Sequence, residues 1–265
     1  MLNSIKRYIK MILRSNGLYV EKSTSKNAVL SLIKSLYPIA IDKDLIRLGP
    51  EYDGGYLVPD DLENIKACFS PGVGRMSNFE FSCLEYGMQL FLADKSVDGP
   101  GIENKQLNFL KKYVGPINND DYTTLDDWVA SSMGNDPGDL MLQMDIEGFE
   151  YFTILNASEQ LLKRFRVIVI EFHNLHKLWN KEFYLTASLV FQKILQNHYC
   201  IHIHPNNISP LYVQNGVEIP SVAEFTFIRK DRSENKGFRT DFPHQLDRDN
   251  TPNSPVVLPK IWYKA

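Results

Sequence analysis

The chain has 265 residues, enough for one large α/β domain or two small ones. Hydrophobic residues make up 43% and charged residues 23%, and the formal net charge of −3 gives no global attraction to nucleic acid or to an anionic membrane. The three cysteines are far apart and fit neither a disulfide framework nor a zinc-binding spacing, so we expect a reduced, cytoplasmic protein.

Residues 1–45 are predicted to form an N-terminal helical extension. Met1–Arg14 alternates apolar and basic residues, without the apolar run of a signal peptide or of a spanning helix. We expect this segment to pack on its own domain or on a neighbouring subunit. Contact with a membrane surface is the alternative, and no stable membrane insertion is expected. A second helix is predicted over Ser25–Tyr37, where Pro38 ends it.

A short glycine-containing segment, Asp53-Gly54-Gly55-Tyr56, follows the extension. Asp-Gly often marks a hairpin turn, while paired glycines also let the backbone approach a ligand closely. From these residues alone, we favour the turn.

The next segment has the order strand, glycine turn, helix, strand. An apolar strand enters Gly72-Val73-Gly74, a helix is expected over Ser77–Gly87, and the strand Met88–Asp94 ends in an acid. An acid about 20 residues beyond such glycines is the ribose-binding residue of dinucleotide and nucleoside folds. The third glycine of the dinucleotide fingerprint is absent, which argues against a dehydrogenase and favours S-adenosylmethionine as the nucleoside cofactor.

The segment Leu140–Glu150 is the centre of the predicted fold. Leu140–Met144 reads as a strand buried on both faces, and its carboxyl end places Asp145 and Glu147 at the sheet edge where open α/β folds bind ligands. The alternative is a strand followed by an ordinary acidic helix N-terminus.

Strands alternate with helices through the rest of the chain, which predicts a mainly parallel sheet in one domain over residues 46–230. Residues 231–265 are polar and Pro-rich, and we expect this tail to pack on the domain or on a partner. The remaining predicted elements are a strand over Leu107–Gly115, a helix capped by Thr124, a helix over Glu150–Ala157, a strand over Arg166–His173, a helix over Thr186–Asn197, and strands over Tyr199–Asn207 and Val222–Arg229.

Together these segments resemble the FkbM-type S-adenosylmethionine-dependent methyltransferases, from about residue 45 to the end. The most specific element is the Asp-x-Glu-Gly-x-Glu pattern that starts at Asp145. The matching segments are Asp53–Tyr56, Ser70–Gly74, Phe79–Glu80, Asp94, Thr124–Trp128, Met144–Glu150, Ile170–His173, His202–Asn207 and Phe242–Asn250.

The resemblance implies a class I methyltransferase, with a Rossmann-like, seven-stranded, mostly parallel sheet whose last strand is antiparallel. It also implies S-adenosylmethionine as cofactor and a sugar hydroxyl as acceptor, often in surface polysaccharide biosynthesis such as that of a capsule. The family's usual Asp-x-Gly opening is Ser70-Pro71-Gly72 here, so the Asp53–Tyr56 turn is the candidate for helping to hold the amino-acid end of the cofactor. The candidate cofactor-binding residues are Asp53, Gly54, Gly55, Tyr56, Ser70, Gly72, Gly74, Glu80, Asp94 and Asp145.

Methylation of an alcohol needs help from a base or a divalent ion, because an alcohol is a poor nucleophile near neutral pH. One hypothesis has Asp145 with Glu171 or His173 holding Mg or Mn, which prefer oxygen-rich ligand sets. The other is free of metal and uses His173 or His204 as general base. Asp145, His173 and His204 are therefore the catalytic candidates.

Further polar residues lie near the predicted strand ends. Glu147 is a candidate for substrate binding or for contact with backbone N–H groups at the helix start. Asn206 and Asn207 would bind sugar hydroxyls or merely form a turn. His202 is expected to face away from His204 and to be structural.

The substrate is expected to be a small-molecule or glycan-linked sugar, and a GDP-linked sugar is an expectation by analogy. The competing function is a catalytically silent subunit that binds S-adenosylmethionine or a nucleotide. A homo-oligomer could form through the N-terminal helices and the tail. The absence of a basic stripe argues against nucleic acid as a partner.

Overall fold

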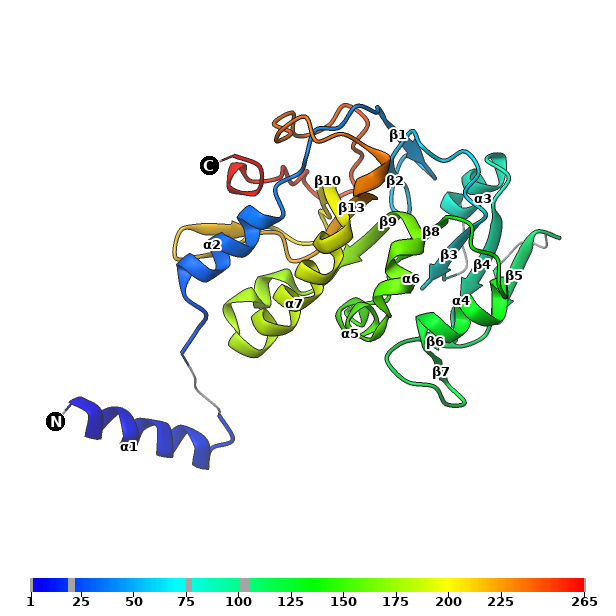
Figure 1. Ribbon diagram of the computed structural model, residues 1–265. Coiled ribbons are helices and arrows are strands. Elements are labelled where there is room, and N and C mark those ends of the chain that lie inside the picture. Colours follow the sequence, from blue (N-terminus) through cyan, green and yellow to red (C-terminus); the bar gives the residue numbers. More distant parts are fainter. Residues whose placement is uncertain (1, 19–21, 75–77, 101–104, 265) are drawn as a thin grey trace.

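The computed structural model describes residues 2–18, 22–74, 78–100 and 105–264 (Figure 1). Its centre is a seven-stranded sheet in the order β10-β13-β9-β8-β3-β4-β5. The strands are β3 (Ala67–Pro71), β4 (Gln89–Ala93), β5 (Leu107–Leu110), β8 (Leu140–Met144), β9 (Phe165–Phe172), β10 (His198–Pro205) and β13 (Ala223–Arg229).

The pairing directions confirm the predicted fold class. β13 runs antiparallel to both β9 and β10, whereas β3 pairs in parallel with β4 and β8, and β5 and β9 extend the parallel part. One antiparallel strand lies next to the edge of an otherwise parallel sheet, and the strand order reverses between β3 and β8. This is the class I methyltransferase arrangement that the family resemblance implied.

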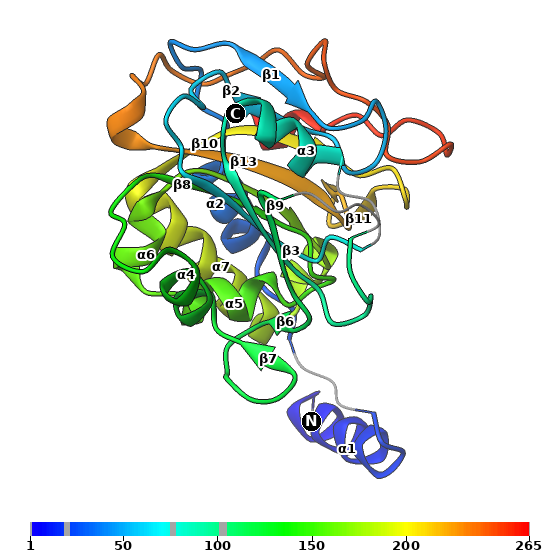
Figure 2. The same ribbon diagram turned by 90° about the vertical axis from the view of Figure 1, so that its right-hand side faces the viewer.

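Two layers enclose this sheet, one made of helices and the other of a helix and a β-hairpin (Figure 2). One face is covered by α2 (Lys26–Ser35), α4 (Leu125–Met133), α5 (Glu150–Asn156), α6 (Glu159–Arg164) and α7 (Lys181–Asn197). The other face is covered by α3 (Asn78–Glu85) and by the hairpin of β1 (Leu45–Leu48) and β2 (Tyr56–Pro59). The sheet is therefore buried on both faces, which explains why its strands read as continuous apolar runs.

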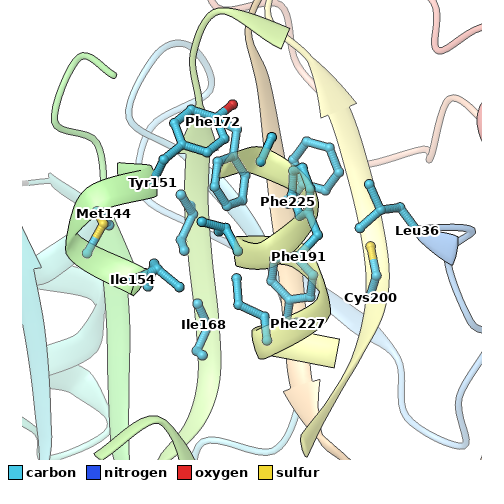
Figure 3. Close-up of a cluster of buried hydrophobic side chains, with 14 of the residues drawn as sticks. Leu36, Met144, Tyr151, Ile154, Ile168, Phe172, Phe191, Cys200, Phe225 and Phe227 are labelled. Atoms are coloured by element: carbon cyan, nitrogen blue, oxygen red, sulfur yellow. The ribbon is translucent and has the colours of Figure 1, made fainter. Parts of the chain in front are cut away.

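Aromatic side chains form the centre of the larger core cluster (Figure 3). Phe172 of β9 packs against Phe191 of α7, with ring centroids 4.7 Å apart, and edge-on against Phe225 of β13, at 5.4 Å. Tyr151 of α5 joins the same group. These contacts attach the helices that follow β8 and β9 to the strands whose carboxyl ends form the candidate site.

Several predicted boundaries are confirmed closely. β8 begins and ends where the strand was predicted, and Thr124 caps α4 by accepting a hydrogen bond from Asp127 N. α3 covers most of the helix predicted over Ser77–Gly87, and Ser77 lies outside the described residues. Asp53, Gly54 and Gly55 lie in the turn of the antiparallel β1–β2 hairpin, as favoured from these residues, and Tyr56 begins β2.

Shorter elements were not predicted. They are β7 (Tyr122–Thr123), β11 (Tyr212–Gln214), β12 (Val217–Ile219) and the 3-10 helices Leu175–Trp179, Lys230–Arg232 and Lys260–Trp262. The single strand predicted over Leu107–Gly115 is instead two strands, β5 and the short β6 (Tyr113–Val114). The β11–β12 hairpin had a local signal, because Asn215-Gly216 joins its strands with φ values of 52° and 71°. The other elements are too short to show a periodicity.

The N-terminal helices differ in how they relate to the sheet. Val29, Leu32 and Ile33 of α2 are buried in the larger core cluster, whereas α1 (Leu2–Ser15) lies apart from the body of the molecule (Figure 1). Packing of this first segment on its own domain is contradicted, since Ile9 and Tyr8 remain 50% and 61% exposed, whereas packing on a neighbouring subunit stays a prediction. None of the described helices combines the length and apolar character needed to cross a membrane.

The C-terminal tail returns to the body. Leu258 and Trp262 are buried in the larger core cluster, and Trp262 Nε1 donates a hydrogen bond to the carbonyl of Glu218, at 3.1 Å. α2 and the tail thus both contribute to the core, while the predicted domain boundaries stay predictions.

The turns that follow β3 and β8 meet at Gly72. Its φ is +89°, and a Cβ there would lie 1.6 Å from the carbonyl oxygen of Asp145. Only glycine allows this approach, because any side chain would displace the backbone of the next turn.

We expect Gly72→Ala to lower the free energy of unfolding by about 3 kcal/mol or more, because the backbone clash adds to the left-handed strain. Gly74→Ala is the matched control, since its φ is +55° but no atom of the described residues outside its chain neighbours lies within 4 Å of its added Cβ. It should lose only about 1–2 kcal/mol. Urea unfolding of both variants checks the difference, and equal losses would contradict the close contact at Gly72.

Candidate active site

Two adjoining pockets lie at the carboxyl ends of β3 and β8, where the strand order reverses and open α/β sheets bind ligands. Their volumes, about 570 Å³ and about 300 Å³, are in the range of small-ligand sites. Gly72, Gly74 and Asp145 line both. The larger pocket is also lined by Ala93, Asp94, Ser96, Tyr113, Val114, Tyr122, Ile146, Glu147 and Phe149. The smaller one adds Pro50, Tyr52, Asp53, Gly54, Tyr56, Val73, Asn78, Phe79, Glu80 and Gln143.

Asp94 ties the end of β4 to the glycine turn. Its carboxylate accepts hydrogen bonds from the backbone N–H of Gly74, at 3.0 Å, and of Ser96, at 2.7 Å. These contacts fix the carboxylate at the wall of the larger pocket. Binding of a ribose by Asp94 stays a prediction.

An aromatic wall of the larger pocket was missed from the sequence. Tyr122 lies between Tyr113 and Phe149, with ring centroids 5.4 Å and 6.1 Å away, respectively. The three side chains come from two very short strands and from the turn before α5. No local sequence pattern predicts such a wall, because it forms only when these segments come together in the folded chain.

A buried polar network forms part of the wall of the smaller pocket. The Ser70 hydroxyl contacts a carboxyl oxygen of Glu80 and lies 2.5 Å from Oε1 of Gln143, whose amide donates to Tyr56 Oη at 3.3 Å. A hydroxyl has only one proton to donate, so one of its two neighbours must donate to it. Burial raises the pKa of Glu80, and a protonated Glu80 satisfies this requirement.

The predicted cofactor-binding residues fall into two groups, those that line a pocket and those that do not. Ser70 and Gly55 line neither pocket: Ser70 lies in the buried network, and Gly55 packs against the Pro50 carbonyl. The others line at least one pocket: Asp53, Gly54, Tyr56, Gly72, Gly74, Glu80, Asp94 and Asp145.

Acidic side chains surround one nitrogen of His173, at the end of β9. Its Nε2 lies 3.5 Å from Glu147 Oε2, 3.8 Å from Asp145 Oδ1 and 4.0 Å from Glu171 Oε1. Its Nδ1 lies 3.0 Å from Oε1 of the fully buried Glu150. When Nδ1 donates its proton to Glu150, the lone pair of Nε2 faces the other carboxylates.

The turn between β8 and α5 creates this arrangement. Glu147 has a φ of 57°, rare for a residue with a side chain, and Gly148 follows at 104°. Glu150 Oε1 holds the turn by accepting from Ile146 N and Gly148 N, at 3.2 Å and 3.0 Å. The backbone-binding role considered for Glu147 thus belongs to Glu150, and the Glu147 side chain, 87% exposed, points to His173 instead.

Burial and crowding shift the protonation of this cluster. Burial, together with the neighbouring Glu147 and Glu150, raises the pKa of Asp145 to about 7, although His173 opposes the shift. Burial and the nearby Asp145 raise the pKa of Glu171. Burial alone would lower the pKa of His173, but its hydrogen bond with Glu150 and the adjacent carboxylates raise it. These three side chains therefore hold protons more tightly than they would in water.

Part of the predicted metal-ligand set comes together. Ligand atoms of Asp145, Glu147 and His173 all lie within 4.8 Å of one another, and Asp145 Oδ1 is buried without a hydrogen-bond partner. Glu147, expected as a substrate contact, thus joins Asp145 and His173. Glu171 lies beside them, and its Oε1 accepts a hydrogen bond from Asn206, at 2.9 Å.

The other predicted histidine lies in a second cluster. His204 Nδ1 and His202 Nε2 lie 3.7 Å and 2.8 Å from the same oxygen of Asp247, in the tail. The expectation that these histidines face opposite sides is wrong, because residues two apart on a strand share a face. His204 lines neither pocket, and its catalytic role stays a prediction.

Asn206 and Asn207 make contacts within the protein. Besides its bond to Glu171, Asn206 accepts from Ile208 N, at 2.9 Å, which forms the turn considered from sequence. Asn207 exchanges hydrogen bonds with Thr251 of the tail. Substrate binding by either residue stays a prediction.

We expect Asp247→Asn to lower the free energy of unfolding by about 3 kcal/mol, since it leaves the buried His202 and His204 without their charge partner. The side chain of Asp247 is only 7% exposed. Although burial opposes it, the nearby carboxylate of Asp247 raises the pKa of His204, so the ionic contribution is present below the ordinary histidine pKa and is lost as pH rises through the raised value.

The loss should therefore be larger at pH 6 than at pH 9 in urea unfolding. Asp241→Asn is the control, because the carboxylate of Asp241 is 65% exposed in its pair with Arg239. It should cost less than about 1 kcal/mol at either pH. A similar small loss for Asp247→Asn would contradict the assigned role.

Comparison with known proteins identifies a family domain within the chain. Residues 96–209 match the family model described as "Methyltransferase FkbM domain", which confirms the predicted resemblance over that segment and supports a methyltransferase, a class that uses S-adenosylmethionine in general. No curated protein matches the chain. A solved structure, "Crystal structure of 23S rRNA methyltransferase ErmE", matches at 6% identity over 82% of this chain and 73% of that chain, with a TM-score of 0.35, a likeness too slight to support an argument.

Proposed function

We propose that this FkbM-type methyltransferase is an S-adenosylmethionine-dependent O-methyltransferase whose acceptor is a sugar hydroxyl. The acceptor would be a nucleotide-linked sugar, such as a GDP-sugar, or a glycan sugar in the biosynthesis of a surface polysaccharide such as a capsule. One observation carries the proposal: Asp145 belongs both to the pockets beside the glycine turn and to the acid–histidine cluster. A methyl donor and a group that activates a hydroxyl could therefore lie next to each other.

The residues of the larger pocket fit a nucleoside cofactor. Among the residues that the structure describes, none outside the chain neighbours of Gly74 places an atom within 4 Å of its Cβ position, which leaves room for a ligand there. Asp94 offers a fixed carboxylate for ribose hydroxyls, and Tyr113, Tyr122 and Phe149 offer ring faces for a purine. Asp53 and Tyr56 of the hairpin turn would hold the amino-acid end in the smaller pocket. When bound, S-adenosylmethionine supplies a methyl group activated by its sulfonium.

The acid–histidine cluster can lower the energy of the acceptor hydroxyl in two ways. With a divalent ion, Asp145, Glu147 and His173 would bind the ion, and the hydroxyl would lose its proton more easily. Without an ion, His173 would accept the proton directly. The raised pKa of His173 favours the first route, because a ring that holds its second proton more tightly is less available to accept one from the acceptor hydroxyl.

Glu150 supports the same route. A histidine that binds a metal through one nitrogen commonly donates the proton of its other nitrogen to a carboxylate. The contact of His173 Nδ1 with Glu150 has this form. The donor set of two carboxylates and one imidazole suits Mg or Mn.

The cofactor assignment predicts that S-adenosylhomocysteine binds the purified protein in calorimetric titration. Asp94→Asn should weaken binding roughly tenfold or more, because it removes a charged acceptor at the pocket wall. Asp120→Asn is the control, since Asp120 is an exposed acid that lines neither pocket. If the protein shows no binding with or without Mg and Mn, the proposed function is wrong.

The metal assignment predicts that Mn binds the protein, as measured by electron paramagnetic resonance. His173→Ala and Asp145→Asn should each weaken binding by about 10–100-fold. His176→Ala, a histidine outside the cluster, should leave it unchanged. Unchanged Mn binding in the first two variants would exclude this ligand set.

The chemistry itself is tested by methyl transfer from labelled S-adenosylmethionine to a panel of nucleotide sugars and glycans. Transfer that survives excess chelator but disappears in His173→Ala would favour the metal-free route. Binding of the cofactor without transfer to any sugar would instead favour the silent cofactor-binding subunit.

A further inference from the structure

Helix α1 presents an apolar face that the described part of the molecule does not cover. Ile5, Tyr8, Ile9 and Ile12 follow the spacing of one helix face, and they are 53%, 61%, 50% and 44% exposed. Both views show α1 standing away from the sheet and its helices (Figures 1 and 2). Four large apolar side chains on one stripe in water predict a partner for this face.

The opposite face of α1 is basic. Arg7, Lys10 and Arg14 are exposed and repeat at helical spacing, and a rotation of about 100° per residue places them across the helix from the isoleucines. The helix sequence also contains Lys6 and no acidic residue. This charge is local, because the whole chain has a net charge of −3.

We propose that α1 lies in the plane of an anionic lipid surface. Its apolar stripe would enter the boundary between headgroups and acyl chains, and its basic side chains would contact the acidic headgroups. The helix has 14 residues, fewer than the roughly 20 needed to span the hydrocarbon core, so the binding is peripheral.

A second copy of the chain fits α1 less well. A helix pair held by apolar seams needs three to four heptads, whereas α1 has two. Pairing would also bring two basic, acid-free helices together, and like charges would then repel each other. An anionic surface satisfies both faces of the helix at once.

Ten residues, 16–25, join α1 to α2, which is packed in the core. A chain of that length spans at most about 36 Å, so the body would stay close to the bound membrane. This reach would let the acceptor sugar be carried by a membrane lipid. That last step alone rests on the proposed function.

The test is sedimentation of the full-length protein with lipid vesicles. We expect binding to vesicles of phosphatidylcholine mixed with phosphatidylglycerol, weaker binding at high salt, and little binding to phosphatidylcholine alone. Ile9→Ser should weaken binding roughly tenfold and Arg7→Gln about fivefold. Ile117→Ser removes an isoleucine of similar exposure, 53%, outside α1 and should leave binding unchanged.

A second measurement reports the position of the helix. Tyr8→Trp should show a blue-shifted fluorescence with the anionic vesicles only, because its side chain belongs to the apolar stripe. Equal binding to neutral and anionic vesicles, or binding to neither, would overturn the proposal. Self-association that depends on Ile9 in sedimentation velocity, without vesicle binding, would assign the face to a second copy instead.

The same preparations separate this proposal from the proposed function. α1 contributes no residue to either pocket, so its variants should bind S-adenosylhomocysteine as the wild type does. If a variant loses vesicle binding but still binds S-adenosylhomocysteine, the result bears on the role of α1 and not on the proposed function.

Discussion

The contact between Gly72 and the carbonyl of Asp145 is the constraint on which the site depends. It brings the turn after β3 against the turn after β8, at the point where the strand order reverses. The glycine turn then borders the nucleoside-sized pocket, while Asp145 begins the turn that carries Glu147 and Glu150. A bulkier residue at position 72 would separate these two turns, and the pockets would lose their shared wall.

Burial of acidic groups at one sheet edge is the second organising feature. Glu171 of β9 and Glu224 of β13 are cross-strand partners, and His204 of β10 lies opposite Glu224 on its other side. Burial raises the pKa of Glu224 to about 7, although His204 opposes the shift. Such groups are costly to bury, and they are tolerated where partners or ligands compensate. Asn206 and Asn250 are two of those partners here.

Much of the fold could be predicted, because the sheet is buried on both faces and its strands are short apolar runs between helical patterns. β8, β9 and the glycine turn were visible in this way. The candidate site was visible only in part. Asp145 and His173 stand at strand ends and were found, but Glu150 lies inside a helix and reaches back to His173. Asp247 comes from the tail, 45 residues after His202, so only the folded chain shows their contact.

The sequence by itself determined the order of the strands and helices, the glycine turn and the acids that end β4 and β8, because these depend on local hydrophobic periods and backbone freedom. It also determined the two faces of α1, since helical spacing alone separates its apolar and basic residues. Only the tertiary structure decided which side chains meet: the grouping of Glu147 with Asp145 and His173, the aromatic wall, and the exposure of α1. These depend on distances between segments far apart in the chain, which no local pattern encodes.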